Sequence, residues 1–429
     1  MAVALGALWA WDAYEKAVVS YYTKKYKTVP LPDEPTYGPN DVSIIVPTID
    51  TESTFSECLR LWLRSKPREV IIVTVPRCKR QVEQLIQRLE GSTDKITILT
   101  SPVANKRQQL MIGAKFASGK IHALVDDDAY WPVDTVIPYL LAPFEDAEIG
   151  AVAGIQSAEI SPERQDPKVI TVWEAAAALD MFQMKGLQAM RFAADGGCWA
   201  LVGRTLFVRA AILQDPHFIN AFTHQIVGNR VENGADDVFV TEWTFDHGWK
   251  VCVQNSPESK ITTDVKQDHK FAWQVLRWER GNIRSFLSRI FVYPGSRAMM
   301  RRHPYSTRKM IERLARPLWA FVYVTVWLKT LWTAPWLSIA YVVWMILGWG
   351  GWVSAYRAFL EEYPYCGRKI WALLLMGNIA PILDVYMYCT MNNDSWLTRA
   401  ADAQDVDDQD VDSIEKIEDM SETPTKFTS

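Results

Sequence analysis

The chain has 429 residues, a length that accommodates about two or three domains and a large buried core. Its formal net charge of -4 excludes a strongly basic nucleic-acid-binding protein, and its six dispersed cysteines, without a CxxC pair, argue against a disulfide framework or a structural zinc site. The charge is unevenly distributed, because residues 401–429 contain ten acidic residues and two lysines, a net of -8, which leaves +4 for residues 1–400.

The first eleven residues are apolar, and Asp12, Glu15 and Lys16 then interrupt the run. A membrane span needs about 20 apolar residues, and a signal peptide would begin with basic residues. We therefore expect residues 1–39 to form an interfacial helix or a partial membrane segment.

Residues 43–128 alternate between short apolar runs and amphipathic runs, a pattern that predicts βα units. The predicted strands are 43–47, 69–75, 95–100 and 121–125, and the predicted helices are 54–65, 79–90 and 104–118. Strands joined by helices form a mostly parallel, Rossmann-like sheet, which binds ligands beyond the carboxyl ends of its strands. The expected fold class is therefore α/β, and chemistry is expected after Val46, Val75, Thr100 and Val125.

Two charged segments follow predicted strands. Lys106 and Arg107 open a helix, where cations beside free backbone N–H groups suit a diphosphate. Asp126, Asp127 and Asp128 follow the strand 121–125, and such adjacent carboxylates suit Mg²⁺ or Mn²⁺. The alternatives are an ordinary charged helix start and a solvated acidic turn.

Two later segments carry further candidates. Asp236 and Asp237 precede an apolar run, where a carboxylate could remove a proton from an acceptor hydroxyl or, alternatively, cap a helix. Gln274 and Arg277 share one face of a predicted amphipathic helix, with Trp278 beside them. An interfacial helix with no catalytic role is the alternative for this segment.

The C-terminal part is rich in apolar residues and holds nine of the 19 tryptophans, within residues 316–400. We predict membrane spans at 317–334, 336–353 and 370–390; a buried globular helix is the alternative for the third, which contains Asp384. Seven basic residues between Arg297 and Arg316 precede the first span, so the large upstream region is expected in the cytosol of a multi-pass protein of the cell membrane. The acidic tail is expected to be disordered, and the side of the membrane on which it lies stays open.

These motifs, in this order along the chain, resemble those of the processive family 2 glycosyltransferases, which are the hyaluronan, chitin and cellulose synthases. The resemblance covers residues 40–400 and rests on Val46-Pro47, Lys106-Arg107, Asp126-Asp127-Asp128, Asp236-Asp237 and Gln274-x-x-Arg277-Trp278. The chain is most similar to the fungal type 2 glycosyltransferases of the cell surface, and Trp396-x-Thr398-Arg399 resembles an element of chitin synthases. This likeness implies a GT-A-like domain and inverting transfer from a UDP-sugar to a growing cell-surface or cell-wall polysaccharide, at the lipid bilayer.

The resemblance also assigns roles. It implies Asp237 as the general base with Asp236 beside it, and Asp126 and Asp128 as contacts of the metal and the donor diphosphate. Donor binding is assigned to Pro47, Asp50, Lys106, Arg107, Asp127, Gln274 and Arg277. Acceptor binding is assigned to Gly197, Cys198, Trp199 and Trp278.

The expected organisation is a membrane segment (1–39), a cytosolic GT-A domain (40–268), interface helices with QxxRW (269–316), spans (317–390) and a tail (391–429). Two departures from the family pattern leave alternatives open. The second strand ends in Val73-Thr74-Val75-Pro76 without the usual acid, and three spans are few for a translocating channel without a homo-oligomer or partner. The alternatives are a non-processive transferase that glycosylates a membrane lipid and a membrane-anchored pseudoenzyme scaffold.

Overall fold

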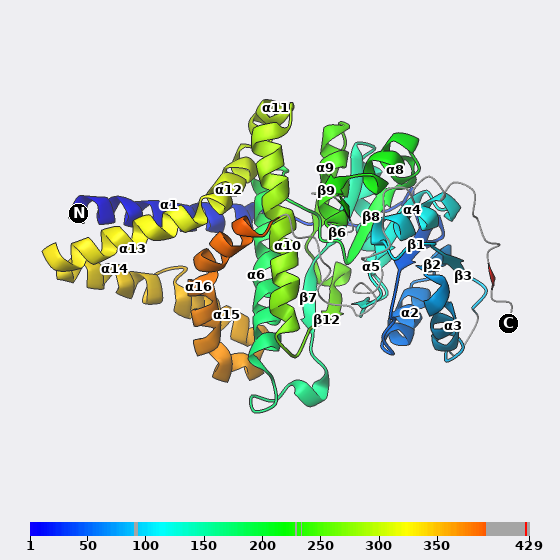
Figure 1. Cartoon of the computed structure of the whole chain (residues 1–429), viewed down its shortest axis with the longest axis horizontal. Helices are drawn as coiled ribbons and strands as arrows, with labels where there is room; N and C mark the ends of the chain where they lie inside the picture. Colours follow the sequence, from blue (N-terminus) through cyan, green and yellow to red (C-terminus); the bar gives the residue numbers. More distant parts are fainter. Residues whose placement is uncertain (90–92, 228–229, 233, 392–424, 427–429) are drawn as a thin grey trace.

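The computed structural model describes residues 1–89, 93–227, 230–232, 234–391 and 425–426, and its centre is a mixed sheet (Figure 1). The strand order is β11-β6-β8-β4-β1-β2-β3-β13. The bounds are β1 Val42–Pro47, β2 Glu69–Thr74, β3 Ile96–Thr100, β4 Ile121–Val125, β6 Ile149–Gly154, β8 Thr205–Arg209, β11 Lys250–Gln254 and β13 Thr425–Lys426. Strands β4, β1, β2 and β3 are parallel to one another, as are β6 and β11, whereas β8 runs antiparallel to β4 and β6. The four predicted strands and the predicted parallel pairing are confirmed.

Both faces of the sheet are buried, which explains why its strands are apolar at successive positions. Val42, Ile44 and Val46 of β1 pack into one core with α2 (Phe55–Arg64) and α3 (Lys79–Ile86). Ile45 points to the other face, into a core shared with α4 (Lys106–Phe116), α8 (Pro216–Thr223) and α9 (Asp236–Asp246). The sheet therefore forms the middle layer of an α/β domain.

A second sheet of three strands, β5 (Ala129–Tyr130), β12 (Ile261–Asp264) and β7 (Gln156–Glu159), begins directly after the acidic triplet. Buried indoles hold this region in place: Trp62 Nε1 donates to the Ala129 carbonyl at 2.8 Å, and Trp131 Nε1 donates to Thr205 Oγ1 at 3.1 Å. Two long helices, α6 (Val172–Asp195) and α10 (Lys270–Leu287), lie side by side between this region and the C-terminal helices (Figure 1).

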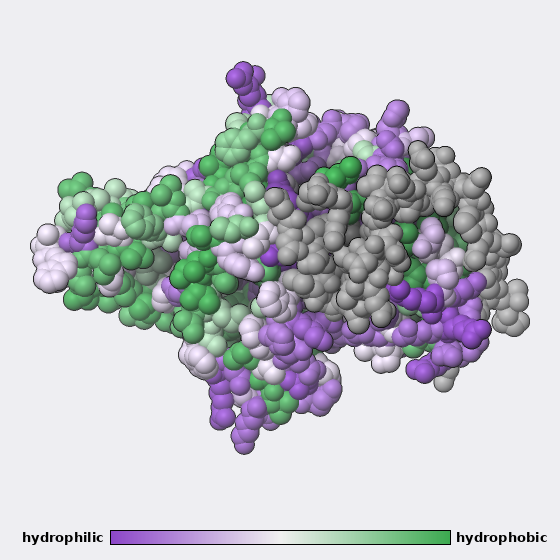
Figure 2. Space-filling model, in the orientation of Figure 1, coloured by the Kyte–Doolittle hydropathy of each residue, from purple (hydrophilic) through white to green (hydrophobic). Residues whose placement is uncertain are grey.

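The remaining helices are α5 Val136–Leu141, α7 Ala210–Leu213, α11 Ser296–Arg302, α12 Pro304–Leu314, α13 Arg316–Thr333, α14 Pro335–Leu347, α15 Trp352–Glu362 and α16 Ile370–Cys389. Helices α13 and α14 form a hairpin that projects from the body, and its surface is strongly hydrophobic (Figures 1 and 2). In the described chain, Pro335–Glu362 and Pro364–Cys389 are long and apolar enough to cross a membrane. The predicted span 317–334 is helical but is not among them.

Asp384 of α16 is fully buried and faces protein, as a charged residue in an apolar helix should. Its carboxylate accepts hydrogen bonds from Arg316 and forms an ion pair with Arg313, and Arg313 also pairs with Glu279 of α10. This chain of ion pairs ties the C-terminal helices to α10.

The N-terminal helix is longer than the apolar run predicts: α1 spans Ala2–Lys25 and packs against α6, α13 and α14. Its charged residues continue the helix because other helices supply their partners. Asp12 accepts from Tyr323 and Tyr341 at 2.7 and 2.5 Å, and Glu15 pairs with Arg308 at 2.7 Å. The interfacial position expected for residues 1–39 stays a prediction. Within the acidic tail, residues 391–429, the structure describes residue 391 and the short strand β13, and the Trp396 element lies outside the described residues.

Candidate active site

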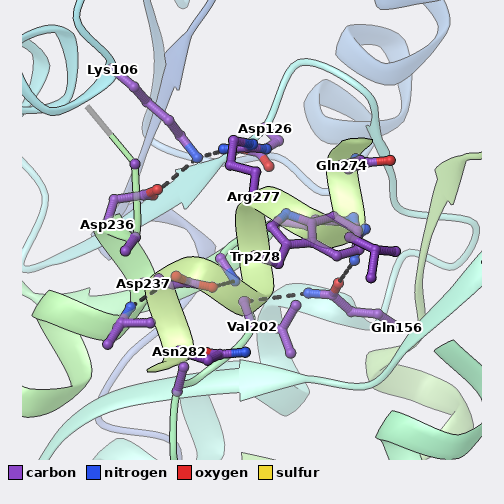
Figure 3. Close-up of a pocket in the computed structure, with 18 of the residues that line it drawn as sticks. Lys106, Asp126, Gln156, Val202, Asp236, Asp237, Gln274, Arg277, Trp278 and Asn282 are labelled. Carbon is purple, nitrogen blue, oxygen red and sulfur yellow. Dashed lines mark hydrogen bonds and ion pairs between the residues drawn. The ribbon is translucent and has the colours of Figure 1, made fainter. Parts of the chain in front are cut away.

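A cavity of about 540 Å³ opens at the carboxyl ends of β1 and β4, where the sequence predicts ligand binding. Its walls come from these strand ends and from α4, α6, α9 and α10. Figure 3 labels residues contributed by α4, α9 and α10. The predicted site residues that line it are Pro47, Asp50, Lys106, Asp126, Asp127, Asp128, Cys198, Trp199, Asp236, Asp237, Gln274, Arg277 and Trp278. Segments that are more than 200 residues apart in the chain therefore share one cavity, whose volume suits a small ligand.

Lys106 joins the two acidic segments. Its Nζ lies 2.8 Å from Asp126 Oδ1 and 3.0 Å from Asp236 Oδ2 (Figure 3). The lysine stands at the start of α4, where Asn105 caps the helix by accepting from the Gln108 N–H at 3.1 Å. Burial opposes the charge of Lys106, but the Asp126 and Asp236 carboxylates outweigh burial and raise its pKa above the ordinary value. This lysine is therefore a fixed cation at the acidic end of the cavity.

The three residues of the acidic triplet are not equivalent. Asp127 Oδ2 accepts from Thr48 Oγ1 at 2.5 Å, and its side chain is largely buried. The Asp126 N–H donates to the Arg204 carbonyl at 3.0 Å, which fixes the turn against β8. Asp127 thus anchors the turn to the end of β1, while Asp126 also reaches the cation of Lys106.

Asp237 is held by two backbone donors. Its Oδ2 accepts from the Gly203 N–H at 3.1 Å, and its Oδ1 accepts from the Val238 N–H at 2.8 Å. Burial and the neighbouring Asp236 raise the pKa of Asp237 to about 6, whereas Lys106 offsets burial and lowers the pKa of Asp236. The residue before the helix is Ala235, in the left-handed conformation with φ +51°, so neither aspartate is the N-cap of α9. One carboxylate is fixed as an anion, and its neighbour can take up a proton near neutral pH.

Helix α10 presents Gln274, Arg277 and Trp278 to the cavity (Figure 3). The Arg204 guanidinium lies 5.2 Å from the centroid of the Trp278 ring, within cation–π range. Arg204 Nη1 also donates to Gln156 Oε1 at 2.7 Å. The indole is therefore fixed in the wall, and Gln156 and Arg204 are site residues that the sequence analysis missed.

Arg107 does not line the cavity, and its predicted donor contact is corrected. The side chain is buried between the rings of Phe222 and Phe239, with its Cζ 4.9 and 5.2 Å from their centroids. Its guanidinium donates to the Gly234 carbonyl at 2.8 and 3.1 Å and to Gln225 Oε1 at 2.7 Å. Arg107 therefore positions the loop that precedes Asp236.

The predicted acceptor loop follows α6, which ends at Asp195 and is capped by Gly196 in the left-handed conformation with φ +67°. Gly197 lines a neighbouring cavity of about 260 Å³, and Cys198 and Trp199 line both cavities. Trp199 Nε1 donates to the Ser306 carbonyl at 3.2 Å. Burial raises the pKa of Cys198 to about 12, so this thiol stays protonated and is no nucleophile.

The sequence analysis did not identify helix α6 as part of the site. This helix contributes Asp180, Met184, Lys185, Gln188 and Arg191 to the cavity wall. A capping box opens this helix: Thr171 Oγ1 accepts from the Glu174 N–H at 3.2 Å, and Glu174 Oε2 accepts from the Thr171 N–H at 2.8 Å. The Thr-x-x-Glu spacing and the helical spacing of the polar residues were signals in the sequence.

Residues 39–281, more than half of the chain, match the family model described as glycosyltransferase like family 2. The chain belongs to this family. It is 62% identical to the NDP-glycosyltransferase ltbB of Aspergillus luteorubrus over 409 residues, which cover 95% of this chain and 100% of that protein. It is 34% identical to a type 2 glycosyltransferase of Zymoseptoria tritici over 303 residues, 67% of this chain and 61% of that protein.

The fold of this family 2 glycosyltransferase also matches a solved structure. The mannosyltransferase PcManGT of Pyrobaculum calidifontis, in complex with GDP-Man and Mn²⁺, aligns with a TM-score of 0.56 and 18% identity, covering 87% of this chain and 97% of that one. The predicted GT-A-like fold is confirmed, as are the likeness to fungal type 2 glycosyltransferases and the use of a nucleotide sugar.

Proposed function

We propose that this glycosyltransferase transfers a sugar, with inversion, from a UDP-sugar to an acceptor hydroxyl at a membrane surface. The observation that carries the proposal is the pair of adjacent carboxylates in one cavity: Asp236 paired with Lys106, and Asp237 with its pKa raised to about 6. Asp237 removes the proton of the acceptor hydroxyl as that oxygen attacks the anomeric carbon. The bond from the anomeric carbon to the diphosphate oxygen then breaks, and UDP leaves.

The donor diphosphate is assigned to the acidic end of the cavity, with Lys106. Asp126 and Asp128 carry the hard oxygen atoms that Mg²⁺ or Mn²⁺ prefers. Among the described residues, no group of three His, Cys, Asp or Glu side chains is arranged to hold a metal ion. That fits a cation held by one or two carboxylates together with donor phosphates and water. Such a cation would neutralise charge on the departing diphosphate.

Donor turnover with and without metal tests this proposal. The protein is purified in detergent, and UDP release is measured with UDP-glucose, UDP-N-acetylglucosamine and UDP-glucuronate. We expect turnover with at least one donor and a loss of about 100-fold or more when EDTA removes divalent cations, restored by added Mg²⁺ or Mn²⁺. Turnover that EDTA leaves unchanged would contradict the role of Asp126 and Asp128. No turnover with any of these donors would contradict the proposed reaction and favour the scaffold alternative.

Substitution of Gly203 tests how precisely the Asp237 carboxylate must be positioned. A Cβ at this position would lie 2.9 Å from Asp237 Cβ, so Gly203→Ala must displace the carboxylate. We expect kcat to fall about tenfold to a hundredfold, because small misplacements of a catalytic group are costly. The matched control is Gly38→Ala, since a Cβ at Gly38 meets nothing within 4 Å. Equal kcat in both variants would show that the position of Asp237 does not limit the rate.

More specifically, we propose that the enzyme polymerises sugars into a cell-surface polysaccharide. The presence of Gln274, Arg277 and Trp278 in the cavity wall favours this reaction. The second candidate is single transfer to a membrane lipid, which the hydrophobic hairpin of α13 and α14 favours (Figure 2). Separating the radiolabelled products by gel and by solvent extraction distinguishes long chains from a lipid carrying one sugar. We place Pro335–Glu362 and Pro364–Cys389 in the membrane and the sheet domain in the cytosol, and proteolysis of sealed vesicles tests that orientation.

A further inference from the structure

Helix α6 presents a row of mostly polar side chains to the catalytic cavity. Asp180, Met184, Lys185, Gln188 and Arg191 recur at helical spacing, so they share one face of the helix. The polar members other than Asp180 are engaged within the protein. Lys185 pairs with Glu362, Gln188 Nε2 donates to the Ala200 carbonyl at 3.3 Å, and the Arg191 guanidinium lies 3.5 Å from the centroid of the Trp199 ring.

Asp180 differs from these neighbours. Within the described part of the chain, its carboxylate has neither a hydrogen-bond partner nor an ion-pair partner. Burial and Glu279 raise its pKa to about 6, and Arg204 only partly opposes them. Asp180 is partly exposed and lines the cavity, so its carboxylate can accept hydrogen bonds from a molecule bound there.

The charged neighbours of Asp180 place it at the acceptor end of the cavity. Glu279 directly follows Trp278 in α10, and Arg204 lies over the Trp278 ring. The acidic triplet, which is assigned to the donor diphosphate, is not among the charges that act on Asp180. Asp180 therefore belongs with Trp278, on the wall assigned to the acceptor.

We propose that Asp180 binds hydroxyl groups of the acceptor, and that the acceptor is therefore a polyhydroxylated molecule such as a sugar ring. This proposal rests on the proposed function, because it names the acceptor class of the same site. A carboxylate accepts hydrogen bonds from neighbouring hydroxyls, and such charge-assisted bonds are strong. Asp180 is thus a specificity-determining residue, distinct from the base Asp237.

The test compares acceptors with many hydroxyls and with one. The purified full chain is given its active UDP-sugar with glucose, N-acetylglucosamine or cellobiose, or with n-octanol as the single-hydroxyl probe. In Asp180→Asn we expect KM for the best sugar acceptor to rise about 10- to 100-fold, while KM for the donor and for n-octanol changes less than about twofold. Asp180→Glu should recover part of the loss. The matched control is Asp33→Asn, an exposed aspartate outside the cavity.

The outcomes separate this proposal from the proposed function. If the wild type turns over the donor but uses n-octanol as well as any sugar, or if Asp180→Asn leaves the sugar KM unchanged, the acceptor assignment is wrong. If donor and acceptor KM rise together, or if both Asp180 variants fail to fold, Asp180 is structural and the proposal is overturned. If the wild type releases no UDP from any donor, the proposed function itself fails.

Discussion

Asp237→Asn is expected to lower kcat about 100- to 10,000-fold, because it removes the group assigned to take the proton of the acceptor hydroxyl. Asn has nearly the same shape and keeps an oxygen that can accept from the Gly203 or Val238 N–H, so thermal stability should change little. Steady-state kinetics with the active donor measure the effect. The matched control is Asp215→Asn, which keeps an N-cap of α8 at a residue that does not line the cavity.

Asp237 is also expected to determine how kcat/KM depends on pH. Burial and Asp236 raise the pKa of Asp237 to about 6, while Lys106 and the backbone donors oppose them. Because the base must be unprotonated, kcat/KM of the wild type should fall as the pH drops through about 6, by about tenfold per unit below it. The residual activity of Asp237→Asn should lack this acid limb. An unchanged profile in the variant, or a wild-type profile that is flat from pH 5 to 8, would assign the proton transfer to another group.

Lys106→Met is expected to lower both stability and activity, because it leaves Asp126 and Asp236 facing one another without their shared cation. Removing one partner from a buried ion pair costs about 3 to 5 kcal/mol. We expect a value near the lower end, about 3 kcal/mol, because the pair is not fully buried: 18% of the Lys106 side chain and 29% of the Asp126 side chain are exposed to solvent. Loss of a cation at the donor diphosphate should also lower kcat/KM about 100-fold.

Denaturant unfolding in detergent and donor kinetics check this prediction. The stability loss should be largest at neutral pH, where Asp236 is charged, and should shrink as the pH falls toward the lowered pKa of Asp236. Lys120→Met is the matched control, because Lys120 is 67% exposed and its ion pair with Asp41 should contribute about 1 kcal/mol or less. Equal losses in the two variants would mean that Lys106 has no special electrostatic role.

The sequence was most informative where burial imposes a pattern. The βα repeats from Val42 onward were predictable because each strand is buried on both faces, and the acidic triplet was predictable as a site because it directly follows a strand. The motifs on α9 and α10 also reach the cavity. The positions of the strand ends followed from topology, whereas the contact of Lys106 with Asp236 depends on the tertiary fold.

Other features depend on partners that the sequence does not identify. Lys106 and Arg107 are adjacent at a helix start, yet one reaches the cavity and the other lies between Phe222 and Phe239. Nothing local distinguishes the two cations. The extent of α1 depends on tyrosines and basic residues about 300 positions away, and Asp180 shows its importance only when the surroundings of α6 are known.

The packing of α1 also constrains the order of events during synthesis. This helix is translated before the sheet domain, but Arg308, Tyr323 and Tyr341, which satisfy Glu15 and Asp12, are translated roughly 300 residues later. Until then its charged side chains lack their final partners, so α1 cannot adopt its final packing while the sheet domain is being made. Helices α12, α13 and α14 therefore complete the packing of α1 only after the sheet domain has been made, and a nascent chain that stops before Tyr341 lacks the contact between Tyr341 and Asp12.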